Sequence, residues 1–131
     1  YQIKTEDKNV VIAGRSRLVS SPLAKILSSN SYNANVTVIH SKTSNQKQFT
    51  TKADIFISAV GSAKLYDFSY FKKGATIIDI GISSVDGKTY GDIDTQDLSG
   101  LVSYRSPFPG GVGPITVSAL FFNLSRILQS N

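Results

Sequence analysis

The predicted fold depends first on the stretch Asn9-Val10-Val11-Ile12-Ala13-Gly14-Arg15-Ser16. The run from Asn9 to Ala13 is short, β-branched and apolar on both faces, which is typical of a strand buried within a parallel sheet. Gly14 ends the run and allows a sharp turn. The stretch Ser20-Ser21-Pro22 is the expected start of a following helix, with a serine cap before the proline. A buried strand that leads directly into a helix predicts the first half of a βαβ unit.

The same alternation continues along the chain. Apolar runs predict strands over residues 35–40, 52–61, 75–81 and 101–104, and helical patterns predict helices from residue 20, over 67–73 and over 114–129. The polar stretch 43–52 is short enough to be a helix with its loops, and residues 83–94 form a polar excursion with a turn at Asp86-Gly87. This order predicts an α/β fold: one domain over residues 1–131, built as a Rossmann-like, doubly wound parallel sheet with helices on both faces.

Composition limits the class of protein. The chain has 131 residues, of which 40% are hydrophobic and 18% charged, as in ordinary globular domains. No apolar run approaches the roughly 20 residues that a membrane span needs, and the first eight residues lack the apolar core of a signal peptide. Cysteine is absent, which agrees with a reducing compartment, and we expect the cytoplasm or an organelle matrix. Methionine is also absent, so we expect a C-terminal piece of a longer protein.

The net charge of +5 favours an anionic ligand, such as a cofactor that carries phosphates. The basic residues are scattered and form no run of five or six, which argues against a nucleic-acid or anionic-membrane partner. A basic nucleic-acid binder remains a weaker alternative, recognisable by binding that falls steeply with salt.

Glycine, serine and basic residues gather where the predicted strands end. Ligands of open parallel sheets bind beyond the carboxyl ends of the strands, near the point where the strand order reverses. The candidate groups at these ends are Gly14-Arg15-Ser16, His40-Ser41-Lys42-Thr43, Gly61, Gly81-Ile82 and the loop Pro109-Gly110-Gly111-Val112-Gly113-Pro114-Ile115-Thr116. Their shared position is better evidence for a site than any one of them alone.

Two of these groups indicate the kind of ligand. The loop after the first strand leads into a helix whose N-terminal amides can hold a pyrophosphate, although its single glycine does not match the G-x-G-x-x-G fingerprint. NAD-binding domains often carry an acidic residue at the end of the second strand, but this chain has His40 and Ser41 there. Because Arg15 can hold phosphate oxygens across the same crevice, we predict NADP rather than NAD. His40 is equally well explained as a polar residue that closes the strand.

The other candidates have simpler explanations beside the functional one. Gly61 and Gly81 are typical of plain turns, and Asp79 is expected to be a hydrogen-bonded structural residue. Asp92 and Asp94 are expected to hold a turn. No Ser–His–acid or Cys–His set is present, so no hydrolase site is predicted. No metal site is predicted either, because the chain has one histidine and no cysteine.

The motifs resemble the C-terminal cofactor domain of the methylenetetrahydrofolate dehydrogenase/methenyltetrahydrofolate cyclohydrolase family, from about Asn9 to Asn123. The resemblance rests on G-R-S-x-x-V-x-x-P at residues 14–22, V-T-V-x-H-S-K-T at 36–43, A-D-I at 53–55, K-x-G-A-x-x-I-D-x-G-I at 72–82, G-D-I-D at 91–94 and P-G-G-V-G-P-x-T at 109–116. The chain departs from the family pattern at Ser20, Ser83 and Phe108, where Gly, Asn and Val are usual.

The resemblance implies roles for particular residues. Gly14, Arg15 and Ser16 would form the phosphate-binding turn, with Arg15 and Ser41 on the 2′-phosphate. The backbone of Ile82 would hold the nicotinamide carboxamide. The remaining implied contacts are His40 in the same crevice, Gly113 and Thr116 near the nicotinamide and its phosphates, and Pro109, Gly110 and Gly111 beside the substrate. No catalytic residue is implied here, because the family's catalytic Tyr and Lys belong to an N-terminal folate domain absent from this chain.

The resemblance therefore implies half of an enzyme of one-carbon metabolism. The whole protein would transfer hydride from 5,10-methylenetetrahydrofolate to NADP, would hydrolyse the methenyl product in bifunctional members, and would form a homodimer. The isolated chain is expected to be inactive. The alternative is a non-catalytic module that senses a dinucleotide or serves as a scaffold.

Overall fold

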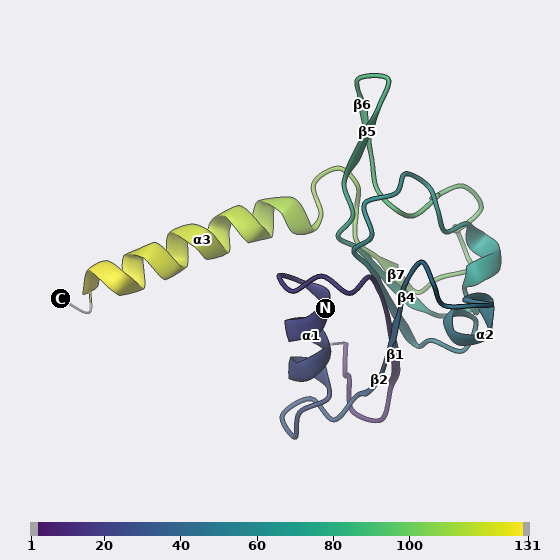
Figure 1. Ribbon diagram of the computed structural model, residues 1–131, viewed down its shortest axis with the longest axis horizontal. Coiled ribbons are helices and arrows are strands. Elements are labelled where there is room, and N and C mark those ends of the chain that lie inside the picture. Colours follow the sequence, from purple (N-terminus) through teal and green to yellow (C-terminus); the bar gives the residue numbers. More distant parts are fainter. Residues whose placement is uncertain (1–2, 130–131) are drawn as a thin grey trace.

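A parallel sheet of five strands forms the centre of the molecule in the computed structural model, which describes residues 3–129 (Figure 1). The strand order is β2-β1-β3-β4-β7, and every neighbouring pair is parallel. The strands are β1 (Asn9–Ala13), β2 (Asn35–Ile39), β3 (Ile55–Ser58), β4 (Thr76–Asp79) and β7 (Tyr104–Arg105). A separate antiparallel hairpin consists of β5 (Ser83–Val85) and β6 (Lys88–Tyr90). The predicted parallel α/β fold is confirmed.

Short helices lie on opposite faces of the sheet. Helix α1 (Ser20–Leu27) covers one face, where Val10 and Ile12 of β1 point. Helix α2 (Lys47–Thr50) and a 3₁₀ helix at Phe68–Tyr70 lie on the other, where Val11 and Ala13 point. This division follows from the alternation of side chains along a strand, because both sides of β1 are apolar.

Aromatic side chains fill the core on the α2 face. The ring of Phe56 lies 5.0 Å from that of Tyr66 and 5.3 Å from that of Phe71. The Tyr66 hydroxyl donates to Oε1 of Gln46 at 3.0 Å. Burial raises the pKa of Tyr66 to about 12, with a smaller contribution from the charge of Asp92, so the phenol stays protonated at neutral pH and keeps this hydrogen bond.

Several predicted boundaries shift. The third strand is limited to β3, the last strand moves from 101–104 to Tyr104–Arg105, and the predicted helix over 67–73 is a 3₁₀ turn. The excursion over 83–94 contains the β5–β6 hairpin, in which Asp86 and Gly87 both have positive φ, as the predicted turn requires. Helix α1 starts at Ser20, but the predicted serine cap is wrong. Val19 occupies the N-cap position, Ser20 and Ser21 lie within the helix, and the hydroxyl of the buried Ser20 has no hydrogen-bond partner.

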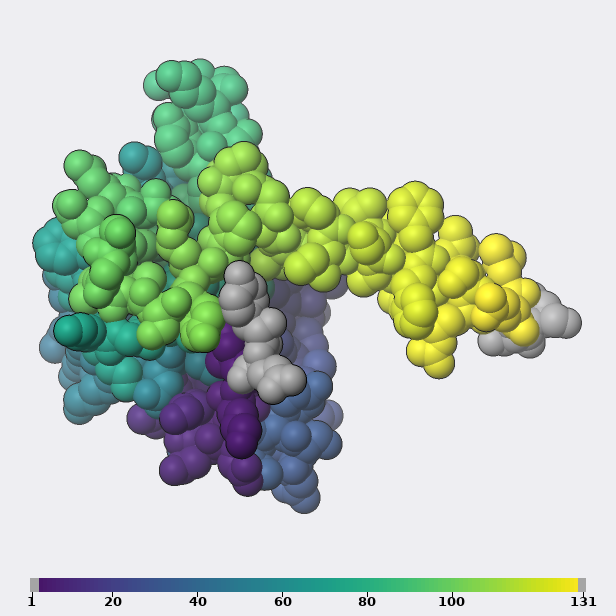
Figure 2. Space-filling model, turned by 180° about the vertical axis from the view of Figure 1, so that it is seen from behind, coloured from purple at the N-terminus to yellow at the C-terminus, as the bar shows by residue number. Residues whose placement is uncertain are grey.

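The last helix does not cover the sheet. Helix α3 (Val112–Gln129) projects away from the body of the molecule (Figures 1 and 2). It has no buried residue, and its apolar side chains are mostly more than half exposed. Of the predicted helices, therefore, α1 and α2 cover opposite faces of the sheet, and α3 covers neither face. No helix within residues 3–129 is long and apolar enough to cross a membrane.

Candidate functional site

The strand order reverses between β1 and β3, and the first candidate turn lies at this point. Gly14 follows β1 with a φ of +116°, and its amide donates to the carbonyl of Ile39 at 2.8 Å. A Cβ on Gly14 would lie 2.7 Å from the carbonyl oxygen of Ala59. Only glycine fits both the conformation and the space, so the floor of the crevice is bare backbone.

Ser16 organises the start of α1. Its Oγ accepts hydrogen bonds from the amides of Val19 at 3.1 Å and Ser20 at 3.4 Å, while its carbonyl accepts from Ser21. Because the Ser16 hydroxyl accepts in both side-chain bonds, its own proton remains to donate to an anion. Arg15 is exposed on the same turn. The turn thus combines a guanidinium, a hydroxyl donor and a helix N-terminus.

The second candidate turn follows β2, the neighbour of β1. His40 donates its amide to Oγ1 of Thr43 at 3.0 Å, and the Thr43 amide donates back to the His40 carbonyl at 2.8 Å. The ring Nδ1 of His40 accepts from the Lys42 amide at 3.2 Å. Ser41 and Lys42 are exposed at the tip of the turn. The imidazole therefore shapes the turn that presents Ser41 and Lys42.

A cavity of about 350 Å³ lies at the other side of the same edge, where β4 ends. It brings together six predicted site residues, namely Ile82, Pro109, Gly110, Gly111, Gly113 and Thr116. The walls come from the turn after β4, the loop before α3 and the first turns of α3. Ile82 is 64% exposed although it is a large apolar residue, so its side chain and backbone are accessible to a ligand.

Backbone packing fixes the loop before α3. The Phe108–Pro109 peptide is cis, and a Cβ on Gly111 would collide with the carbonyl oxygen of Pro107. Ser106 ties the start of the loop to β4, because its amide donates to Ile77 and its Oγ accepts from the amide of Asp79. The loop is thus held against the sheet and not free in solvent.

The family described as tetrahydrofolate dehydrogenase/cyclohydrolase, NAD(P)-binding domain, matches residues 1–131. This chain belongs to that family.

Relatives and solved structures agree with this membership. A bifunctional protein FolD from Lactobacillus helveticus is 47% identical over 92% of this chain, which covers 42% of that protein. A 5,10-methylenetetrahydrofolate dehydrogenase from the silkworm Bombyx mori has a TM-score of 0.91 at 37% identity, over 98% of this chain and 46% of that one. A Trypanosoma brucei methylenetetrahydrofolate dehydrogenase-cyclohydrolase complexed with NADP and an inhibitor has a TM-score of 0.82 at 34% identity, over 92% of this chain and 43% of that one. The chain thus spans less than half the length of these relatives.

The structure of this family member separates the predicted residues into two groups along one sheet edge. Gly14, Arg15, Ser16, His40 and Ser41 lie beyond β1 and β2, and the six cavity residues lie beyond β4. Between them lies the end of β3, so a ligand that contacts both groups must be extended. The roles of the individual residues toward a cofactor stay predictions.

Sequence reasoning missed two cavity residues in particular. Thr89 comes from the β5–β6 hairpin, and Val117 comes from the first turns of α3. Neither belongs to a glycine-rich or polar motif that would mark a site. Only the folding of the hairpin and of α3 against the loop brings these side chains to the cavity.

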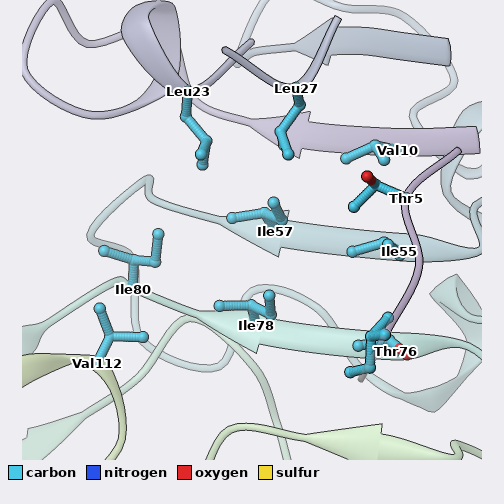
Figure 3. Close-up of a pocket in the computed structure, with 11 residues that line it drawn as sticks. Thr5, Val10, Leu23, Leu27, Ile55, Ile57, Thr76, Ile78, Ile80 and Val112 are labelled. Carbon is cyan, nitrogen blue, oxygen red and sulfur yellow. The ribbon is translucent and has the colours of Figure 1, made fainter. Parts of the chain in front are cut away.

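A separate apolar groove of about 310 Å³ lies on the α1 face of the sheet (Figure 3). Leu23 and Leu27 of α1 point into it from one side, and Ile78 of β4 and Ile80, which directly follows β4, lie opposite. Val112 at the base of α3 lines both this groove and the cavity beyond β4. The groove has an almost wholly apolar lining, so it has no groups for acid–base chemistry.

Proposed function

We propose that these 131 residues form one domain, the NADP-binding half of a methylenetetrahydrofolate dehydrogenase that is bifunctional with methenyltetrahydrofolate cyclohydrolase. The observation that carries this proposal is the pair of residue groups on one sheet edge, in a chain of the NAD(P)-binding family. A dinucleotide has the required extended shape: its adenosine end fits the basic turns after β1 and β2, and its nicotinamide end fits the cavity after β4.

The preference for NADP follows from the charge at the adenosine end. Arg15 and Lys42 are exposed, and Ser41 stands at the tip of the turn after β2. No carboxylate occupies the two turns that would otherwise bind ribose hydroxyls, residues 14–16 and 40–43. A guanidinium and a hydroxyl suit a 2′-phosphate, which an acidic side chain would repel.

The bound cofactor would supply the chemistry, because its nicotinamide accepts a hydride from the methylene carbon of the folate. The residues of this chain would bind the cofactor and orient its nicotinamide. The N-terminus of α1 and Ser16 would hold phosphate oxygens, and the backbone at Ile82 would set the direction of the nicotinamide. The loop at Gly110-Gly111 would leave one face of the ring open to the folate. This half would therefore contribute to catalysis by positioning the nicotinamide relative to the folate derivative.

The folate derivative would be held by the part of the protein that this chain does not span. Two observations support packing of that part here: the exposed apolar side chains of α3 and the open apolar groove beside α1. We further propose that the full-length protein is a cytoplasmic homodimer, for which the exposed edge strand β2 and α3 offer surfaces.

The first experiment is a calorimetric titration of the chain with NADP and with NAD, repeated on Arg15→Ala. We expect the unaltered chain to bind NADP more tightly. Because a guanidinium–phosphate contact is charge-assisted, the variant should lose about 10- to 100-fold in NADP affinity and keep its NAD affinity. The matched control is Arg17→Ala, which removes an exposed arginine from the same loop and should change neither constant.

An equal loss of NADP and NAD affinity in Arg15→Ala would contradict the 2′-phosphate contact. Absence of binding to either dinucleotide would contradict the cofactor site itself. Dehydrogenase turnover by the 131 residues alone would show that the catalytic groups are not confined to the other half. If a longer protein with this chain binds NADP but has no dehydrogenase activity, the sensor alternative replaces the enzyme.

A further inference from the structure

Asp92 is a fully buried carboxylate that joins two loops of the site edge. Its Oδ2 accepts from Oγ of Ser58 at 2.6 Å and from the amide of Val60 at 2.8 Å, and its Oδ1 accepts from the amide of Ser62 at 2.8 Å. These three donors belong to the end of β3 and the turn that follows it. A side chain from the loop after β6 thus sets the path of the chain beyond β3.

Asp79 completes the arrangement from the end of β4. Its Oδ1 accepts from the amides of Gly81 at 3.0 Å and Asp92 at 3.1 Å, and its Oδ2 accepts from the amide of Ile93 at 3.0 Å. Asp79 therefore holds both the turn that leads to Ile82 and the segment that carries Asp92. Burial raises the pKa of Asp79, and the neighbouring charge of Asp92 adds to this effect.

The space around the two carboxylates is closed. A Cβ on Gly81 would collide with the carboxyl group of Asp92, and a Cβ on Gly91 would collide with that of Asp79. Neither carboxylate forms an ion pair within residues 3–129. Since burial of an unpaired charge is costly, the amide and hydroxyl donors are what keep both groups in place.

Of the two turns that Asp92 and Asp79 hold, one lies between the two groups of site residues and the other lies within the group beyond β4. The Val60–Ser62 turn is beyond β3, midway along the edge, and the Gly81-Ile82 turn forms a wall of the cavity at the nicotinamide end. Asp92 itself does not line that cavity. Its effect on a ligand there would pass through the backbone it holds.

We propose that Asp92 is a positioning residue that, together with Asp79, fixes the turns after β3 and β4 and so sets the orientation of the nicotinamide half of the cofactor. The inference rests on the proposed NADP site. It assigns no contact between Asp92 and the cofactor. It separates the cofactor site into an adenosine end that is independent of Asp92 and a nicotinamide end that depends on it.

The test uses two ligands that report on different ends of the site. Adenosine 2′,5′-bisphosphate carries only the adenosine end, whereas NADP carries both. In Asp92→Asn, one of the three donors loses its acceptor, because an amide group has one oxygen where the carboxylate has two. We expect a loss of about tenfold in NADP affinity by calorimetry, with the affinity for the bisphosphate unchanged within about twofold.

Two more variants keep the test decisive. Ser58→Ala retains the buried carboxylate and removes one donor, so the variant should fold. It should bind NADP about threefold more weakly and bind the bisphosphate with unchanged affinity. Asp94→Asn changes a partly buried acid of the same loop, 3.8 Å from Nζ of Lys64, and should change the affinity for neither ligand.

If Asp92→Asn and Ser58→Ala lost affinity for NADP and for the bisphosphate to the same extent, the inference would be overturned, because Asp92 would then have a general structural role. Unchanged NADP affinity in both variants would overturn it as well. Failure of the proposed function gives a different result: the unaltered chain would then bind neither NADP nor the bisphosphate.

Discussion

The buried and exposed aspartates of this chain have opposite electrostatic surroundings. Asp54 accepts from Nζ of Lys72 at 2.6 Å and from the amide of Asn9 at 2.8 Å. The hydrogen bond from Lys72 is the main reason that the pKa of Asp54 lies below its ordinary value, and the Asn9 amide adds to it. Burial raises the pKa of Asp79 instead. Asp54 stabilises the fold when it is ionised. Asp79 instead holds the backbone of its neighbours, because its carboxylate accepts from the amides of Gly81, Asp92 and Ile93.

Acid titration of stability tests the role of Asp54. A lowered pKa in the folded state contributes stability above the unfolded value of 3.8, and this contribution is lost as the pH falls through the folded pKa. Since the pair with Lys72 is partly exposed, Asp54→Asn should lower the free energy of unfolding by about 0.5–1 kcal/mol at neutral pH. The difference should vanish well below pH 3.8 in urea unfolding curves. Asp86→Asn, at an exposed turn position, is the control, and a pH-independent difference would argue against the ion pair.

Single residues also show where sequence reasoning reaches its limit. Gly14 was predicted to allow a sharp turn and Gly111 to lie in the loop beside the substrate, and neither position has room for a Cβ. The cap of α1 was assigned to a serine of Ser20-Ser21 because Pro22 follows, but the hydroxyl that accepts from the amides of Val19 and Ser20 is that of Ser16. Local sequence indicates that a helix begins, whereas the loop path decides which serine reaches its amides.

At the scale of elements, the first two strands were predicted best. The bounds of β1 agree with the prediction, and β2 differs from it by one residue, because both are short runs rich in β-branched residues. Strand β7 was displaced because it has only two residues and pairs with one neighbour, β4. In the cavity, Ile82 and Gly113 were expected from motifs next to strand or helix ends, whereas Thr89 is brought in by the hairpin fold and has no local signal.

Helix α1 provides a prediction at this scale. Ser16→Ala removes the acceptor for the amides of Val19 and Ser20, where α1 begins, so we expect the free energy of unfolding to fall by about 1 kcal/mol. Chemical denaturation at neutral pH measures the change. Ser21→Ala, an exposed serine within α1, is the matched control and should have a much smaller effect. If the two variants lose equal stability, the capping role of Ser16 is wrong.

At the scale of the whole molecule, the sheet and α3 differ in how their apolar residues are used. The core strands are almost fully buried, whereas Ile115, Leu120, Phe121 and Leu128 are each about two-thirds exposed. Amphipathic patterning predicted an apolar face on this helix, but it could not predict that the helix leaves the body. The amphipathic pattern of the helix does not indicate which surface packs against that apolar face.

An exposed apolar helix should make the 131-residue chain associate in solution. Sedimentation velocity over a range of concentrations is expected to show self-association. Leu120→Ser/Leu124→Ser should reduce this association and leave NADP affinity unchanged, because neither residue lines the cavity. Ser118→Ala is a control within the same helix. A chain that stays monomeric at all concentrations would contradict this expectation.

The separation of α3 from the sheet also has a consequence for how the protein is made. All five strands of the sheet lie within residues 9–105, and α3 follows them in the chain. Because domains generally fold from the N-terminal side as synthesis proceeds, the sheet can close while α3 is still inside the ribosome. The exposed apolar surface of α3 then emerges only after the sheet is complete.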